Sequence, residues 1–147
     1  MSDRDNILIS VRGRFIDGML AGTKRVELRR RAPRIAAGTR IWIYEKAPIA
    51  TVRAVAVLAM VETMAPEVLW DRYATTLGLL HNEYQKYLSG CELATALSLE
   101  QVAPIIPISL RQLRESKRDF HPPQFYHRLA AQGSLITILE QGLVVSA

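Results

Sequence analysis

GTKRVELRRR, residues 22–31, lies between an apolar helical pattern and an alternating strand pattern. Val26 and Leu28 are spaced as the buried face of a strand, because successive side chains of a strand point to opposite faces. The other face of that strand carries two guanidinium groups and a carboxylate, from Arg25, Glu27 and Arg29. A polar row of this kind is costly to cover unless a polar ligand meets it. We therefore expect the functional site at this strand.

The order of features around this segment resembles the ASCH-domain family (activating signal cointegrator homology), a branch of the PUA-like superfamily. The family pattern has an extended opening, a helix, a Gly-x-Lys-x-x-Glu-x-Arg turn and strand, and a Gly-led strand that ends near a tyrosine. The resemblance spans roughly residues 7–130 and includes the late segments 107–111 and 121–125. The matching residues of the motif are Gly22, Lys24, Glu27, Arg29, Gly38 and Tyr44.

The periodicity predicts an α+β fold, because strands and short helices alternate without a strict βαβ rhythm. The length of 147 residues and the absence of linkers or repeats favour a single domain over residues 1–147. The family resemblance implies more than this. It implies a small, partly open β-barrel (PUA-like) surrounded by short helices, with a cleft beside the motif.

Individual elements follow from local patterns. Gly22 suits the left-handed residue that ends a helix, Pro66 suits a first helical turn, and Ser109 suits a helix cap. Pro104 and Pro107 indicate an irregular edge segment. We expect helices over 14–21, from Pro66 through Tyr73, over 82–88, over 109–114 and as one turn over 123–129. We expect strands over 7–11, 25–29, 40–44, 51–61, 92–99 and 135–139.

Composition excludes several classes of protein. Cys91 is the single cysteine, so no internal disulfide framework exists, and without a signal-peptide pattern we expect a cytoplasmic protein. The longest apolar runs are too short to cross a bilayer, so we expect no membrane role. His121 and His127 lack a cysteine or carboxylate at ligand spacing, and no nucleotide-binding glycine loop is present. We therefore expect no metal site and no cofactor.

Positive charge is concentrated in the first part of the chain. Residues 1–53 hold 12 Lys and Arg against 5 Asp and Glu, whereas residues 54–147 hold 7 against 9, so the two parts carry +7 and −2. This asymmetry favours a polyanionic partner, because neutralising phosphates releases counterions. The alternative is a solvated basic loop that has no partner. The motif favours nucleic acid, as RNA or a nucleotide.

Lys24, Glu27 and Arg29 have both functional and structural interpretations. Lys24 could contact a phosphate or, if it is desolvated, act as a base. The structural alternative is a surface lysine at a helix C-terminus, where the helix macrodipole favours a positive charge. Glu27 could accept a hydrogen bond from a base edge or form a cross-strand ion pair. The fork of Arg29 suits a planar, bidentate contact to phosphate or a base.

Aromatic residues near the motif suggest a stacking surface. Base stacking on an exposed aromatic ring contributes about 1–3 kcal/mol per base. Tyr44 is expected to reach the cleft because it ends its strand, whereas Trp42 is expected in the core. The resemblance implies that residues of the late segment, among them Gln124, Tyr126 or Arg128, complete the cleft. The alternative for that segment is a proline-braced turn.

We consider three functions. The first is a module that binds single-stranded RNA or a modified base, with Arg34 and its basic neighbours steering the approach. The second is an enzyme, either a metal-independent ribonuclease or a nucleoside amidohydrolase. The amidohydrolase branch carries a nucleophilic threonine where this chain has Glu27, which argues against that activity. The third, a DNA-binding regulator, ranks last because no spare helical pair is present.

The candidate residues divide into two groups. Catalysis would be carried out by Lys24, Glu27 and Tyr44. Nucleic-acid contacts are assigned to Ser10, Arg12, Arg14, Lys24, Arg25, Arg29, Arg30, Arg31, Tyr44, Lys46, Gln124 and Arg128.

Overall fold

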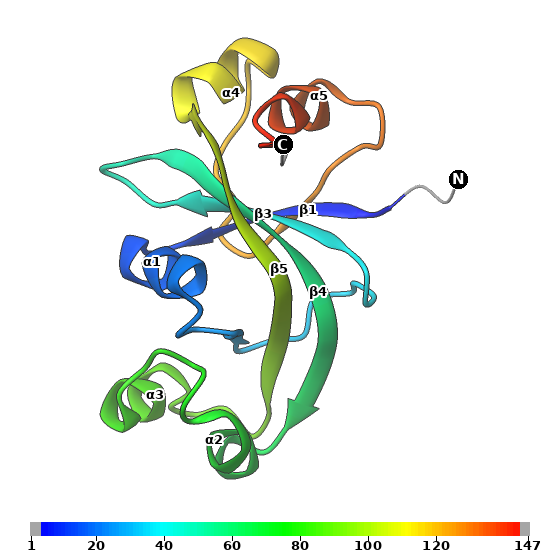
Figure 1. Cartoon of the computed structure of the whole chain (residues 1–147). Coiled ribbons are helices and arrows are strands. Elements are labelled where there is room, and N and C mark those ends of the chain that lie inside the picture. The colour runs from blue at the N-terminus through cyan, green and yellow to red at the C-terminus, as the bar shows by residue number, and fades with distance from the viewer. Residues whose placement is uncertain (1–3, 145–147) are drawn as a thin grey trace.

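A computed structural model describes residues 4–144 of the chain (Figure 1). The described part contains short helices and a six-stranded sheet. The strands are β1 (Asn6–Val11), β2 (Val26–Arg29), β3 (Arg40–Glu45), β4 (Thr51–Met64), β5 (Ala94–Ser109) and β6 (His127–Arg128). The helices are α1 (Gly13–Ala21), α2 (Pro66–Tyr73), α3 (His81–Tyr87), α4 (Leu110–Ser116) and α5 (Ser134–Gln141).

The sheet has the strand order β2-β5-β4-β3-β1-β6. Strands β1 and β3 run parallel, and every other neighbouring pair is antiparallel. Within the described residues the edge strands β2 and β6 do not pair, so the sheet does not close. Long β4 and β5 curve together through the middle of the molecule (Figure 1). The predicted α+β class is confirmed, as a mixed fold with an open sheet and short helices.

Both faces of the inner strands are buried. Ile7 and Ile41 point to the face that α1 covers with Ile16 and Met19. Leu8, Trp42 and Tyr44 point to the opposite face, where Leu113 of α4 and Leu139 of α5 pack on them. A third apolar cluster joins β2 to α2 and α3 through Val26, Leu28, Leu69 and Tyr84. The side chains of β3 therefore alternate between two cores, and its Arg40, Trp42 and Tyr44 do not form a solvent face.

The turn between α1 and β2 brings the motif to one end of the sheet. Gly22 has a φ of 82°, and its backbone N–H bonds back to carbonyls of the last turn of α1. A left-handed residue at this position reverses the chain without a Cβ clash. Strand β2 then pairs with β5, from Val26 opposite Ser98 to Arg29 opposite Thr95. Lys24 and the side chains of β2 consequently lie beside α1 and close to the start of α3.

Three local predictions are corrected. Residues 135–139 form part of helix α5, because Leu135, Ile136 and Leu139 share one helical face that is buried with α4. Residues 123–129 form no helical turn: after Pro122 and Pro123 the chain bends without forming a helix, and His127–Arg128 pairs with β1 as β6. The strand predicted over 92–99 continues as β5 to Ser109, and its segment 104–107 is the irregular edge that Pro104 and Pro107 indicate, because the pairing with β4 shifts register there. The prolines fit there because β2 pairs only with Thr95–Ser98, which leaves the rest of β5 as an edge.

The cap of α4 is confirmed. Ser109 Oγ accepts a hydrogen bond from the Gln112 backbone N–H at 3.1 Å, and Gln112 Oε1 accepts one from the Ser109 N–H at 2.9 Å. This reciprocal arrangement satisfies two donors at the helix start. It ends β5 and begins α4 at the position that the serine indicates.

Candidate functional site

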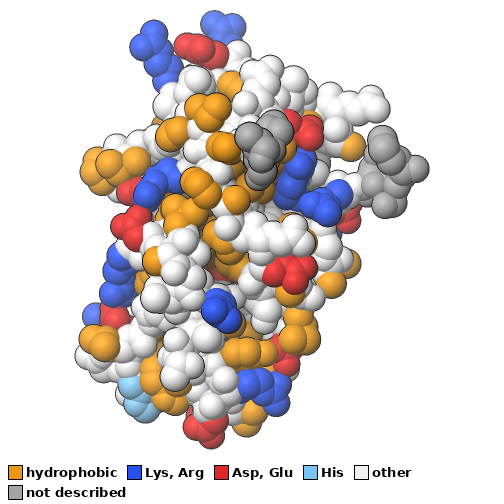
Figure 2. Space-filling model, viewed as in Figure 1, with side chains coloured by type: hydrophobic (Ala, Val, Ile, Leu, Met, Phe, Trp, Pro, Cys, Tyr) orange, Lys and Arg blue, Asp and Glu red, His pale blue; other side chains and the backbone are white. Residues whose placement is uncertain are grey.

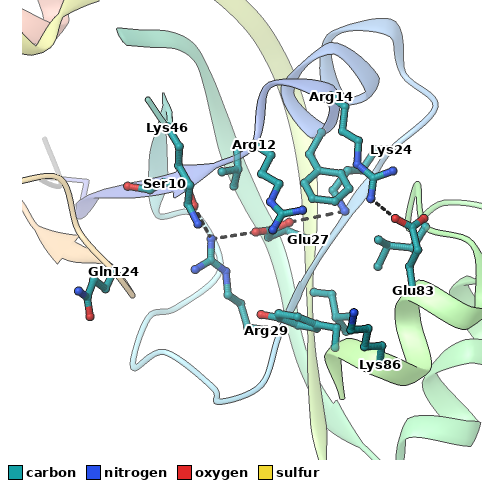
Figure 3. A pocket seen from close by; sticks show the side chains of 15 residues that line it. Ser10, Arg12, Arg14, Lys24, Glu27, Arg29, Lys46, Glu83, Lys86 and Gln124 are labelled. Carbon is teal, nitrogen blue, oxygen red and sulfur yellow. Dashed lines mark hydrogen bonds and ion pairs between the residues drawn. The ribbon is translucent and has the colours of Figure 1, made fainter. Parts of the chain in front are cut away.

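A pocket of about 760 Å³ opens between the end of β1, strand β2, helix α1 and helix α3 (Figure 3). Its wall combines segments that are far apart in the sequence. In Figure 3, Gln124 lies on the side of the pocket opposite Glu83 of α3. The lining residues are Ser10, Val11, Arg12, Arg14, Phe15, Lys24, Glu27, Leu28, Arg29, Lys46, Leu79, Glu83, Lys86, Tyr87 and Gln124.

Three ionisable side chains of the motif form a buried charge cluster (Lys24, Glu27 and Arg29) in this pocket. Each is less than 10% exposed. Glu27 joins the other two, because its Oε2 lies 2.8 Å from Arg29 Nη2 and its Oε1 lies 3.5 Å from Lys24 Nζ. One carboxylate therefore balances two cations, which leaves a net positive charge in a region that water reaches poorly.

Both the ammonium group and the aliphatic stem of Lys24 are in contact with the protein. Its Nζ donates to the carbonyl oxygens of Leu77 at 2.6 Å and Val26 at 2.8 Å, and it lies 4.9 Å from the centre of the Phe15 ring. Its aliphatic stem packs against Gly78, where an added Cβ would come within 3.3 Å of Lys24 Cβ. Burial lowers the pKa of Lys24 from its ordinary value, and the Glu27 carboxylate opposes that shift. The ammonium is thus positioned rather than mobile.

Two buried polar atoms at the pocket have no partner. Within residues 4–144, the side-chain atoms that are buried without a hydrogen bond are Ser10 Oγ and Arg29 Nε. Arg29 uses its other nitrogens, since Nη1 donates to the Phe125 carbonyl at 3.2 Å and Nη2 to Glu27. An unpaired buried polar group costs about 1–3 kcal/mol, and such groups are rare enough to call for an explanation. A polar ligand or ordered water in the pocket would supply one.

Cations also surround the mouth of the pocket, and we refer to Arg12, Arg14, Lys46 and Lys86 as the pocket rim. All four are exposed. Arg14 pairs with Glu83, which links α1 to α3, whereas the other three pair with no carboxylate within residues 4–144. Figure 2 shows cationic side chains along the left edge, at the level between α1 and α3. Counting the buried charge cluster, six cationic side chains face two carboxylates, Glu27 and Glu83.

Part of the predicted site is assembled in this pocket. Eight of the residues that the sequence singled out line it together: Ser10, Arg12, Arg14, Lys24, Glu27, Arg29, Lys46 and Gln124. Four others lie outside its lining. Arg25 donates to the Gly22 carbonyl, Arg30 donates to Cys91 Sγ at 3.2 Å, Arg31 lies over the Phe125 ring, and Arg128 donates to the Arg34 carbonyl.

Tyr44 is not part of the pocket, contrary to the expectation that it reaches the cleft. It is 2% exposed and packs with Leu8 and Trp42 in the core beneath α4 and α5. Its position at the end of β3 suggested exposure, but the helices cover that face of the sheet to the strand's end. Burial raises the pKa of Tyr44. The phenol is therefore neutral at physiological pH and lies apart from the buried charge cluster.

The sequence of a curated protein of Zymomonas mobilis subsp. mobilis, named an ASCH domain-containing ribonuclease, is 39% identical over 122 residues, 83% of this chain and 82% of its own length. This chain belongs to the ASCH-domain family. No protein-family model matches the sequence.

Solved structures of ASCH proteins superpose closely on this one. A crystal structure of ASCH from Zymomonas mobilis has a TM-score of 0.85 at 36% identity and covers 92% of this chain and 96% of its own. A single-residue variant of the same protein has a TM-score of 0.88 at 35% identity, with coverage of 96% and 99%. The NMR structure of Rpa0253 from Rhodopseudomonas palustris, at 12% identity and a TM-score of 0.58, shares the fold.

Helix α3 forms one side of the pocket of this ASCH domain, although none of its residues belongs to the site predicted from the sequence. Glu83, Lys86 and Tyr87 of α3 line the pocket, as does Phe15 of α1. The spacing i, i+3, i+4 places the three α3 residues on one helix face, and a charged face that ends in an aromatic was a signal available in the sequence. Tyr87 is 44% exposed, and the partial burial of its hydroxyl raises the pKa of Tyr87, so it stays neutral.

The pocket of this ASCH domain has the chemistry of an anion site with a polar interior. Its rim presents guanidinium and ammonium donors, and its interior presents a fixed carboxylate, an ammonium and two unpaired polar atoms. Within residues 4–144, no group of three His, Cys, Asp or Glu side chains is placed to hold a metal ion. In the same part of the chain, no helix has the length and apolar character that a membrane span requires.

Proposed function

We propose that this protein binds single-stranded RNA, with one nucleotide in the pocket and neighbouring phosphates on the pocket rim. The observation that carries the proposal is the combination of six cationic side chains with two unpaired buried polar atoms in one pocket. Phosphates supply most of the affinity for a cationic surface, and unstacked bases offer their edges to polar groups. The name of the relative from Zymomonas mobilis, a ribonuclease, points to the same polymer.

Each part of the pocket has a role in this proposal. Rim cations contact phosphates, which position the strand without reading its sequence. The half-exposed ring of Tyr87 offers a stacking face, and the exposed amide of Gln124 is assigned to a base or the 2′-hydroxyl. The buried charge cluster stabilises the pocket from within. Its rigidity favours binding, because few side chains need to be ordered when the nucleotide enters.

Measuring RNA affinity of rim variants by fluorescence anisotropy tests the proposal. Arg12→Ala and Lys86→Ala should each weaken binding of a labelled single-stranded octanucleotide about threefold to fivefold. The slope of log affinity against log salt should fall by about 0.7 for each phosphate that the variant no longer neutralises. Arg111→Ala is the matched control, because this 89% exposed arginine lies on α4 at the far end of the molecule from α3 (Figure 1). Rim variants that bind like the control would overturn the proposal.

Ribonuclease activity is a second candidate, favoured by the name of the relative and by the carboxylate and ammonium that lie side by side in the pocket. In the simplest scheme, the 2′-oxygen of the bound nucleotide attacks phosphorus and its proton passes to Glu27. The bond from phosphorus to the 5′-oxygen breaks, and that oxygen takes a proton from water, which leaves a 2′,3′-cyclic phosphate; the Lys24 ammonium stabilises the negative charge that develops. Tyr44 has no place in this scheme because it lies in the core.

Cleavage of end-labelled RNA, in chelator and separately with added Mg²⁺, tests this second candidate. Wild-type protein should shorten RNA but leave an oligonucleotide with one 2′-deoxy position intact at that position. Glu27→Gln should abolish cleavage while the folded variant still binds. Intact RNA under both conditions would exclude ribonuclease activity, and RNA binding would then be the only function proposed. Acylated nucleosides are not among the proposed substrates, since Glu27 stands where that chemistry needs a threonine.

A further inference from the structure

A second cationic surface begins at the wall of the pocket. The end of β2 and the loop that follows it lie against the segment before β6, because Arg29 Nη1 donates to the Phe125 carbonyl and the Arg34 N–H donates to the Tyr126 hydroxyl at 3.3 Å. Gln124, which lines the pocket, directly precedes Phe125. The two segments therefore form one continuous surface that leads away from the pocket on the side opposite α3.

Three exposed arginines lie on this surface, and we call Arg31, Arg34 and Arg128 the arginine strip. The guanidinium of Arg31 lies 5.1 Å from the centre of the Phe125 ring. The backbone of Arg34 is held at both ends, by Tyr126 and by the side chain of Arg128. These contacts fix the strip to the segment that borders the pocket.

The arginine strip is weakly neutralised. Within residues 4–144, Arg31 and Arg34 pair with no carboxylate, and Arg128 has Asp5 at 4.0 Å. By contrast, Arg40, Arg53 and Arg72 each contact a carboxylate at 3.1 Å or less. Guanidinium groups that are exposed and unpaired keep their donors free for an external anion. The half-buried rings of Phe125 and Tyr126 lie between them as apolar and stacking surface.

We propose that the arginine strip is a second RNA-binding surface, which holds the phosphates of nucleotides that adjoin the one in the pocket. This inference rests on the proposed function of the pocket. Alternation of arginine with aromatic rings suits a single strand, whose backbone meets cations while its bases stack. The arginine strip is continuous with the pocket wall through Gln124 and Phe125, so the RNA strand would run from the pocket along this surface. The protein thus recognises an extended strand rather than a lone nucleotide.

Binding as a function of RNA length tests the strip separately from the pocket. The probes are a labelled single-stranded dinucleotide and an octanucleotide of the same base. Wild-type protein should bind the octanucleotide at least tenfold more tightly. The double variant Arg31→Ala/Arg34→Ala should lose about tenfold in octanucleotide affinity, since two exposed charge contacts each contribute about threefold. Its salt slope should fall by about 1.4, and its dinucleotide affinity should not change.

The control is Arg111→Ala/Arg118→Ala, which removes the same charge from α4 and its following loop and should leave both affinities unchanged. Equal octanucleotide affinity in the strip variant and the control would overturn the arginine strip while pocket binding of the dinucleotide stands. A wild-type protein that binds neither probe would instead overturn the proposed function itself. Arg31→Lys should retain most of the octanucleotide affinity, because it keeps the charge.

Discussion

Lys24 is part of the pocket and also affects the stability of the folded chain. A buried ammonium is costly unless its three protons have acceptors, and here two carbonyl oxygens and Glu27 provide them. The sequence indicated a cation beside a carboxylate at this turn. It did not indicate the partner carbonyl of Leu77, because that contact spans 53 positions of the chain.

The lowered pKa of Lys24 makes the stability depend on pH. Below the folded-state pKa both states hold the proton, so the desolvation penalty is constant. Between that pKa and the ordinary value of 10.5 the unfolded chain binds more protons, so the free energy of unfolding rises with pH. Urea denaturation of wild type and Lys24→Met from neutral pH to pH 10.5 measures this. The difference between them should grow in favour of wild type, and a flat or falling difference would contradict the burial of a charged lysine.

Gly78 is predicted to be needed for the position of Lys24. Its φ of 71° disfavours any side chain, and an added Cβ would also press on the stem of Lys24. Gly90 is the matched control, because its φ is 82° but nothing lies within 4 Å of an added Cβ. Gly90→Ala should lower the free energy of unfolding by about 1–2 kcal/mol through backbone strain alone. Gly78→Ala should lower it further and weaken RNA binding, whereas equal effects of the two substitutions would show that the Lys24 contact is unimportant.

The position of helix α3 beside the pocket could not be predicted from the sequence. The existence of the helix was predicted, and its bounds differ from the prediction by one residue at each end. Its place beside the pocket depends on the packing of Tyr84 with β2, and the exposed Arg14–Glu83 ion pair adds a contact to α1; no local pattern reports either contact. Helix α5 shows the opposite failure. A run of β-branched residues favours a strand, but packing against α4 selects a helix.

Glu83 of α3 is predicted to restrain RNA binding. Its carboxylate adds a negative charge to the pocket and occupies Arg14 of the pocket rim. Glu83→Gln should raise RNA affinity about twofold to fivefold and steepen the salt dependence, because Arg14 becomes free for phosphate. The amide oxygen can still accept from the Leu80 N–H, so α3 keeps that contact. Glu115→Gln on α4 is the control in the anisotropy assay. Unchanged or weaker binding by Glu83→Gln would argue against phosphates at this side of the pocket.

Across the whole molecule, the charge asymmetry of the sequence is partly cancelled by the fold. Arg40 pairs with Glu140, and Arg14 pairs with Glu83, so carboxylates of the second part neutralise cations of the first. Among the cations of the first part that contact no carboxylate in the described range 4–144, Arg12 and Lys46 lie at the pocket rim, and Arg31 and Arg34 lie on the arginine strip. The sequence could predict the α+β class and the residues of the motif that lie together, since both follow from local patterns. It could not predict which charges find partners, because pairing depends on contacts between distant segments.

The most direct measurement is a chemical-shift map of the isotope-labelled protein titrated with a single-stranded octanucleotide. Backbone amides of residues 10–12, 24–29, 83–87 and 124 should shift together as RNA is added, while those of α4 (residues 110–116) should stay unchanged. Shifts confined to α4 and α5, or no shifts at high RNA concentration, would contradict the claim that this pocket binds RNA.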